Sequence, residues 1–202
     1  MNLNPRNGDI PRLKRAARFA RQHLPAGLPP VLILTDPGRG ASPELLAQRM
    51  PPGWGLVYRH FGAPERFEIA ERLAKLAFRG HFTLLIAADP RLAAAVGADG
   101  VHWPEACLLS APRWTGRFRL MTASAHSVSA VCTTQPRGID ARVLSTVFPS
   151  ASPTASAPMG RFRLRKASRD AACPIYALGG ITGETALAVS RWSGLAGVGK
   201  IE

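Results

Sequence analysis

The sequence predicts a single-domain (β/α)8 barrel, the TIM barrel class, and three observations carry this prediction. Eight short apolar segments recur along the chain, and helix-like segments follow most of them. The connections have lengths that suit parallel βα units rather than hairpins. Eight such units can close into a barrel, and closure removes the exposed edges that a long open sheet would keep. A length of 202 residues with 46% hydrophobic residues suits one domain with a sizeable core.

A basic extension over residues 1–27 is expected to precede a barrel over residues 28–202. Within the extension, Arg12–His23 places Leu13, Ala16 and Ala20 on one face at helical spacing, and Lys and Arg residues are frequent at the other positions. This pattern predicts a basic amphipathic helix that ends before Pro25.

The first four βα units follow in order. Val31–Thr35 is an apolar run stopped by Asp36, which indicates a buried strand that ends in a loop. Ser42 and Pro43 are typical of the first positions of a helix, so a short helix is expected over 45–50. The other elements predicted in this half are strands at 55–58, 83–87 and 100–102 and helices at 64–78 and 90–96.

The second half repeats the alternation. Its predicted strands are 119–123, 142–147, 175–178 and 197–201, and its predicted helices are 127–133, 162–171 and 183–192. A loop rich in Ser, Pro and Ala covers 148–160. No helix is predicted after the last strand, because the sequence ends at Glu202. We expect the basic N-terminal helix, or a second subunit, to take that place.

The charge is the unusual part of the composition. Lys and Arg number 26 against 13 Asp and Glu, which gives a net charge of +13 and favours anionic partners. Two basic segments stand out, the N-terminal helix and Arg161–Arg169. The simplest interpretation is that both segments form solvated faces of an arginine-rich protein and have no specific partner. A nucleic-acid surface is the weakest of the functions considered, because no aromatic pattern or nucleic-acid-binding motif accompanies the basic residues.

The sequence also bears on the compartment. Three widely spaced cysteines exclude a disulfide framework and favour a reducing environment. No apolar run approaches the roughly 20 residues of a membrane span, and the N-terminus has no apolar core of a secretory signal. These features predict a cytoplasmic protein without a membrane partner.

Glycine pairs mark a candidate phosphate site. In a (β/α)8 barrel the loops at the carboxyl ends of the strands form the active face, and phosphate characteristically sits after strands 7 and 8. Gly179 and Gly180 follow the predicted strand 7, and Gly199 and Lys200 belong to the predicted strand 8. We expect these residues to bind a phosphorylated small molecule. The alternative is that the glycines only turn the chain.

Several segments, in order, resemble one known family. The most specific is the run AVGADGVHW at 95–103, and weaker matches are VLILTD at 31–36, SAHS at 124–127, VFP at 147–149 and ALGGIT at 177–182. This order resembles the thiamine-phosphate synthases and the related thiazole tautomerases, from about residue 31 to 201. The resemblance implies a place in thiamine biosynthesis and a pocket for a thiazole phosphate, with Ser124, Arg59 and His60 on the active face as substrate contacts.

The synthase reaction of this family joins a pyrimidine diphosphate to the thiazole phosphate, and it requires Mg²⁺ and cations around the leaving diphosphate. The positions that correspond to the metal carboxylates hold Ala88 and Cys107, with Asp89 and Glu105 as the nearest candidate ligands. Pro153 stands where the family has a lysine. The resemblance therefore implies a weakened synthase, although Asp89 and Glu105 would still chelate Mg²⁺ if their loops shifted. The alternative for both residues is helix capping or a solvated surface.

The tautomerase branch moves a proton and needs no metal. His126 occupies the position of its proposed acid/base histidine, and an imidazole titrates near neutrality as proton transfer requires. His102 is interpreted as structural. Three functions therefore stay open at this point: a synthase-type transferase, a tautomerase that uses His126, and a non-catalytic barrel that binds a phosphorylated ligand or a partner. A homodimer also stays open.

Overall fold

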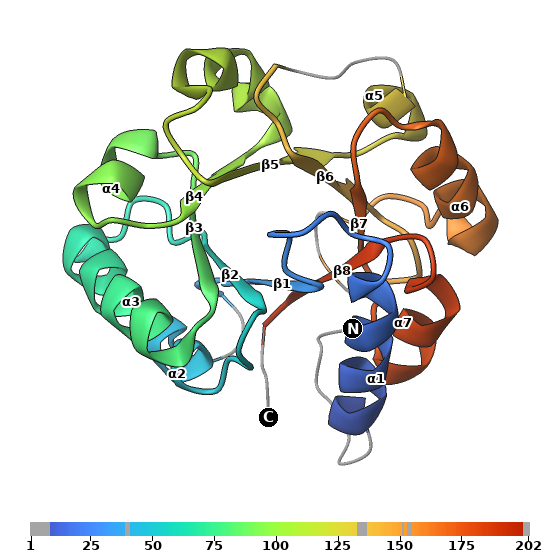
Figure 1. Ribbon diagram of the computed structural model, residues 1–202, viewed down its shortest axis with the longest axis horizontal. Coiled ribbons are helices and arrows are strands. Elements are labelled where there is room, and N and C mark those ends of the chain that lie inside the picture. The colour runs from blue at the N-terminus through green and yellow to red at the C-terminus, as the bar shows by residue number, and fades with distance from the viewer. Residues whose placement is uncertain (1–8, 39–40, 133–136, 151, 153–154, 200–202) are drawn as a thin grey trace.

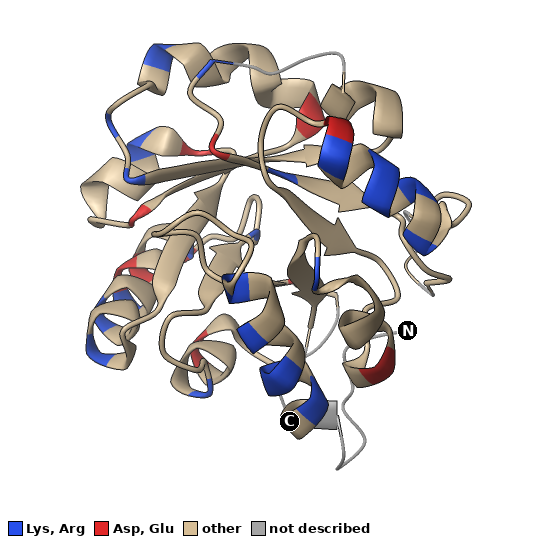
Figure 2. Cartoon of the chain, turned by 45° about the vertical axis from the view of Figure 1, so that its right-hand side comes forward, with Lys and Arg blue, Asp and Glu red and all other residues tan. Residues whose placement is uncertain are grey.

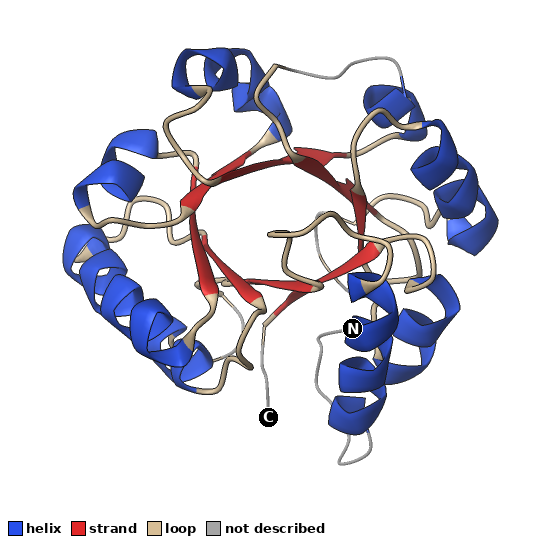
Figure 3. Cartoon of the chain, viewed as in Figure 1, coloured by secondary structure: helices blue, strands red, loops and turns tan. Residues whose placement is uncertain are grey.

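Eight strands form a closed parallel barrel surrounded by helices (Figures 1 and 3). The computed structural model describes residues 9–38, 41–132, 137–150, 152 and 155–199. The strands pair in chain order, and β1 pairs with β8 to close the ring. They are β1 (Val31–Leu34), β2 (Gly55–Tyr58), β3 (Thr83–Ala87), β4 (Gly100–Trp103), β5 (Leu120–Ala125), β6 (Ala141–Ser145), β7 (Ile175–Leu178) and β8 (Gly194–Val198). The predicted fold class is confirmed.

The helices lie outside the ring. They are α1 (Asp9–Arg21), α2 (Pro43–Gln48), α3 (Arg66–Gly80), α4 (Pro90–Ala95), α5 (Val128–Cys132), α6 (Gly160–Asp170) and α7 (Gly183–Val189). The predicted start of α2 is correct, because the Ser42 side chain accepts the Leu45 N–H and Pro43 follows it. Among the described residues, no helix is long and apolar enough to cross a membrane.

Several predicted bounds shift by two or three residues, and two differences from the sequence prediction bear on the site. The last strand lies at Gly194–Val198, three residues earlier than predicted, so Gly199 follows the strand instead of belonging to it. A 3-10 helix, η1 (Glu105–Trp114), connects β4 to β5 where the sequence predicts no element. The hydrophobic pattern of this segment does not predict a helix, because a 3-10 helix has three residues per turn instead of 3.6 and because Pro112 lies within it.

The strands are buried on both faces, which explains why they read as continuous apolar runs. One layer of the core fills the barrel and includes Leu32, Val57, Leu85 and Tyr176. The larger layer lies between the strands and the outer helices. The barrel is therefore a packed core, and a ligand has room only at its ends.

The N-terminal segment covers the base of the barrel, the end at which the strands begin. Helix α1 packs beside α7 and against β8, the place that a helix following β8 would take (Figure 1). After α1, Leu28 joins the apolar cluster inside the barrel. The buried Tyr176 hydroxyl donates a hydrogen bond to the Pro29 carbonyl at 2.6 Å. These contacts close the base, so the opposite end remains for a site.

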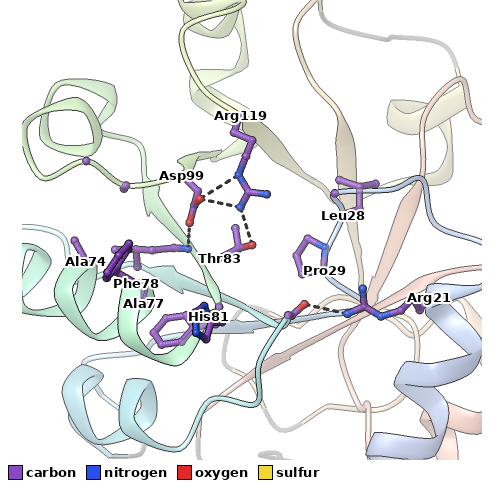
Figure 4. A pocket seen from close by; sticks show the side chains of 16 residues that line it. Arg21, Leu28, Pro29, Ala74, Ala77, Phe78, His81, Thr83, Asp99 and Arg119 are labelled. Atoms are coloured by element: carbon purple, nitrogen blue, oxygen red, sulfur yellow. Dashed lines mark hydrogen bonds and ion pairs between the residues drawn. The ribbon is translucent and has the colours of Figure 1, made fainter.

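A cavity of about 490 Å³ lies beside this base, between Arg21 and Arg119 (Figure 4). Its charged side chains Arg21, Asp99 and Arg119 are already engaged in hydrogen bonds. Asp99 accepts hydrogen bonds from the Arg119 guanidinium at 2.8 Å and from the Leu84 N–H at 2.8 Å. Arg21 donates to the Gly53 carbonyl. We interpret this network as structural, because it joins the start of β3 to the residues just before β4 and β5.

Replacement of Gly100 with Ala should prevent proper closure of the barrel. A Cβ at Gly100 would overlap the Leu120 carbonyl of the neighbouring strand, which cannot move without breaking the sheet. We expect a loss of at least about 3 kcal/mol in the free energy of unfolding, measured by denaturant titration. Gly55→Ala is the matched control, because its Cβ would meet mainly the end of the Leu32 side chain. A cost for Gly100→Ala no larger than that for Gly55→Ala would contradict this account.

Candidate functional site

A pocket of about 240 Å³ opens at the carboxyl ends of the strands. This end is the active face that the barrel geometry predicts. The pocket is lined by the ends of β1, β5, β6, β7 and β8 and by residues that follow them or β2. Its polar side chains are Asp36, Arg59, Ser124, His126, Ser145, Thr146, Ser150 and Ser152. Hydroxyl groups therefore dominate the polar lining.

Arg59 is held in place at the side of the pocket by the end of β1. Its backbone N–H donates to the Thr35 hydroxyl at 2.9 Å, and its Nε donates to the Thr35 carbonyl at 2.8 Å. The Asp36 carboxylate lies 3.7 Å from the guanidinium and offsets part of its charge. His60, the other substrate contact expected after β2, lies outside the pocket: its ring stacks on Tyr58, and burial lowers the pKa of His60.

His126 lies between a hydroxyl and a carboxylate. Its Nδ1 is 3.1 Å from the Ser145 hydroxyl, and its backbone N–H donates to the Glu105 carboxylate at 3.1 Å. The same carboxylate oxygen lies 4.0 Å from Nε2 of the ring. The side chain is 62% exposed, so a ligand can reach it. The exposed ring therefore has a hydroxyl beside Nδ1 and a carboxylate on the side of Nε2.

Ser124 is fixed by a chain of hydrogen bonds inside the barrel. The buried His102 ring bonds the Thr122 hydroxyl through Nδ1 and the Ser124 hydroxyl through Nε2, both at 2.9 Å. Burial, and secondarily the positive charge of Arg59, lowers the pKa of His102 to about 3. The ring is therefore neutral near pH 7 and holds Ser124 at the pocket wall, in line with its structural interpretation.

Of the residues expected to bind phosphate, two line the pocket and two are not found in its lining. Gly179 and Gly180 line the pocket with positive φ angles of 94° and 64°. A Cβ on Gly180 would meet the Pro149 carbonyl at 2.5 Å, so the turn also requires glycine for its packing against the loop after β6. Gly199 does not line the pocket, and its N–H donates to the Leu34 carbonyl instead. Lys200 lies outside the described residues.

The two candidate metal ligands have other partners. Asp89 caps α4 through Oδ1, which accepts the Leu92 N–H, and its Oδ2 pairs with Arg66 at 3.0 Å. Glu105 holds the backbone of His126. Among the residues that the structure describes, no three His, Cys, Asp or Glu side chains form a group suited to a metal ion. This donor set does not fit Mg²⁺, which requires several well-placed oxygen ligands.

Sequence reasoning missed the hydroxyl groups at the end of β6 and in the loop that follows it. Ser145, Ser150 and Ser152 all line the pocket, and Ser150 accepts the Ser152 N–H at 3.3 Å. The signal that could have found Ser150 and Ser152 is their place just before Pro153, the position at which the resemblance places a lysine.

Comparisons with known proteins place the chain in one family. The profile described as thiamine monophosphate synthase matches residues 32–201. A thiamine-phosphate synthase of Synechococcus is 32% identical over 162 residues, which cover 76% of this chain and 46% of that protein. A thiamine-phosphate synthase from Chloroflexus aurantiacus is 31% identical over 168 residues, which cover 79% of this chain and 77% of that protein. The chain thus spans about half the length of the Synechococcus relative.

Solved structures agree with the barrel fold. The thiamine phosphate pyrophosphorylase from Pyrococcus furiosus matches with a TM-score of 0.67 and 22% identity, over 83% of this chain and 84% of that chain. FabK from Thermotoga maritima matches with a TM-score of 0.65 at 14% identity, over 92% and 60% of the two chains. At these identities the likeness shows only the fold. The profile, in contrast, covers most of the sequence, and the chain belongs to the thiamine monophosphate synthase family.

Proposed function

We propose that this protein binds a thiazole phosphate in the pocket at the carboxyl ends of the strands and that His126 transfers a proton on the bound ligand. The observation that carries the proposal is the composition of the pocket, which combines hydroxyls, a glycine turn and one exposed imidazole. Membership in a family of thiamine biosynthesis supplies the ligand class.

The pocket suits a small phosphorylated heterocycle. Serine hydroxyls and the backbone of the Gly179–Gly180 turn can donate hydrogen bonds to phosphate oxygens. Arg59 adds a positive charge that Asp36 partly offsets. This set of donors suits a monophosphate. A diphosphate leaving group would need more positive charge than the described lining provides.

Proton transfer at His126 needs no group beyond this chain. The imidazole takes a proton from one position of the bound ring system and returns it to another, so the product has the same atoms as the substrate. Ser145 fixes the ring through Nδ1, and Glu105 lies on the side of Nε2.

Binding can be tested with the phosphorylated thiazole and its unphosphorylated alcohol. We expect calorimetry to show clear binding of the phosphate and at least about ten-fold weaker binding of the alcohol, because the alcohol cannot form charge-assisted hydrogen bonds through a phosphate. Ser150→Ala should weaken the phosphate by about five-fold, the value of one hydroxyl contact. Ser168→Ala on α6, outside the pocket, is the control. Equal affinities for phosphate and alcohol would refute the assignment of this pocket.

His126→Asn separates catalysis from structure. If His126 transfers the proton, the variant should lower the rate of thiazole phosphate isomerisation by about 10²–10⁴-fold with little change in ligand affinity. A purely structural histidine predicts a lower melting temperature and an unchanged rate per folded molecule. Rate, affinity and melting temperature measured on one preparation distinguish the two, and an unchanged rate would leave a binding protein without this activity.

Synthase activity should be low. Losing the metal carboxylates at Ala88 and Cys107 and the lysine at Pro153 should cost about 3 kcal/mol or more of transition-state stabilisation, a rate loss of at least about 100-fold. The measurement is pyrophosphate release from the pyrimidine diphosphate in the presence of thiazole phosphate and Mg²⁺, with a thiamine-phosphate synthase of the family as positive control. A turnover equal to that of the control would contradict the prediction.

A further inference from the structure

Two basic helices flank α7 on one side of the barrel. Both α1 and α6 pack against α7, and Figure 2 shows bands of Lys and Arg along each of them. The two helices hold ten of the 26 Lys and Arg residues of the chain. These are Arg12, Lys14, Arg15, Arg18, Arg21, Arg161, Arg163, Arg165, Lys166 and Arg169. We call this side, together with the segment 190–193 that follows α7, the basic face.

Aromatic rings lie among these arginines, and Phe19 and Phe162 belong to the two basic helices themselves, so the expectation that no aromatic pattern accompanies the basic residues was wrong. The Arg161 guanidinium lies 4.9 Å from the centre of the Phe162 ring, and that ring is 73% exposed. Arg165 lies 5.5 Å from the ring of Trp192, which is distant in sequence. Phe19 on α1 has Arg15 and Arg191 near its ring, at 5.9 and 5.7 Å. The basic face therefore combines positive charge with planar groups.

The face is also hollowed. A cavity of about 630 Å³ is lined by Phe162, Arg165, Lys166, Ser168, Arg169 and Trp192. A second cavity, of about 300 Å³, shares Ser168 and Trp192 with the first and extends to His23, Leu24 and Pro25. The two cavities thus follow one another from α6 toward the end of α1. The first cavity has three basic side chains and the rings of Phe162 and Trp192 in its lining, whereas the lining of the second contains no Lys or Arg among the described residues.

We propose that the basic face binds single-stranded nucleic acid without sequence preference. Grooves that bind single strands combine positive charges along the backbone with flat side chains on which bases stack. Arg15 and Arg18 on α1 and Arg161, Arg163 and Arg165 on α6 would neutralise phosphates, and the exposed Phe162 offers a stacking surface for one base. Arg12 pairs with Glu184, and Lys166 and Arg169 pair with Asp170, so these three contribute less. The shared chemistry covers RNA and single-stranded DNA. The face lies on the side of the barrel, separate from the pocket at the strand ends.

The observations favour this ligand over a membrane surface. An amphipathic helix binds lipid through an apolar face that is free to insert. In this protein those faces are already used, since Ala16 and Ala20 of α1 and Leu164 and Ala167 of α6 are buried in the protein. A duplex is also a poorer fit, because its bases are stacked on each other and do not reach a side chain such as Phe162.

The test uses labelled oligouridylate and oligothymidylate of about 15 nucleotides, a length that fits single-strand grooves, with fluorescence anisotropy as the readout. We expect both to bind and to lose about 100-fold in affinity between about 50 and 200 mM salt, the change expected for five phosphate contacts. A duplex of the same length should bind more weakly at equal salt. Vesicles with anionic lipid should not compete.

Charge variants locate the surface. Arg161→Gln/Arg165→Gln on α6 and Arg15→Gln/Arg18→Gln on α1 should each weaken binding by about ten-fold and reduce the salt dependence, by about 0.7 in slope for each phosphate that is no longer neutralised. The matched control is Arg79→Gln/Arg91→Gln, which removes the same charge from the α3 and α4 side of the barrel. Phe162→Ala should weaken the single strand by about five-fold or more, and melting temperatures show that each variant is folded.

Three outcomes would overturn the proposal. One is equal affinity of the basic-face variants and the Arg79/Arg91 control, because that would mean that only net charge matters. Another is a Phe162→Ala variant that binds the single strand as well as the unchanged protein. The third is binding to anionic vesicles with no binding to either oligonucleotide. Any of these leaves the pocket at the strand ends, and its proposed function, unaffected.

Discussion

Closure of the barrel is the constraint on which the other features depend. The β1–β8 pairing joins the first and last strands and removes both sheet edges. Once the ring is closed, every strand is buried on two faces, and the interior must be filled by side chains from alternate positions. At Gly100 the neighbouring backbone comes so close that no side chain fits. Closure also brings the ends of β1 and β5–β8 to one small opening.

The charged residues at that opening are few, and the nearby acidic residues have structural partners. The carboxylates expected at Ala88 and Cys107 are missing, and the nearest acidic residues serve the fold: Asp89 caps α4 and Glu105 supports His126. Hydroxyls and a neutral buried histidine make up much of the remaining polar structure.

The architecture could be predicted because buried strands and helix starts have characteristic residue patterns in the sequence. Continuous apolar runs mark strands buried on both faces, and residues such as Ser42 mark helix starts. The last strand was misplaced because glycine-rich sequence carries little side-chain information. Gly199 illustrates the same difficulty at the site, since only the three-dimensional structure shows that its N–H is taken by Leu34. The pairing of Arg165 with Trp192 was equally hidden, because it joins two segments that are distant in sequence.

The position of α1 has a consequence for how the protein acquires its structure. Arg12 pairs with Glu184 across 172 positions of the chain, and Tyr176 reaches Pro29 across 147. During synthesis the first helix therefore emerges long before the surface that covers its apolar side. Contacts between such distant segments make folding slow, because much of the chain must be ordered before they form. Until β7, α7 and β8 are available, the alanine face of α1 stays exposed to chaperones and to other chains.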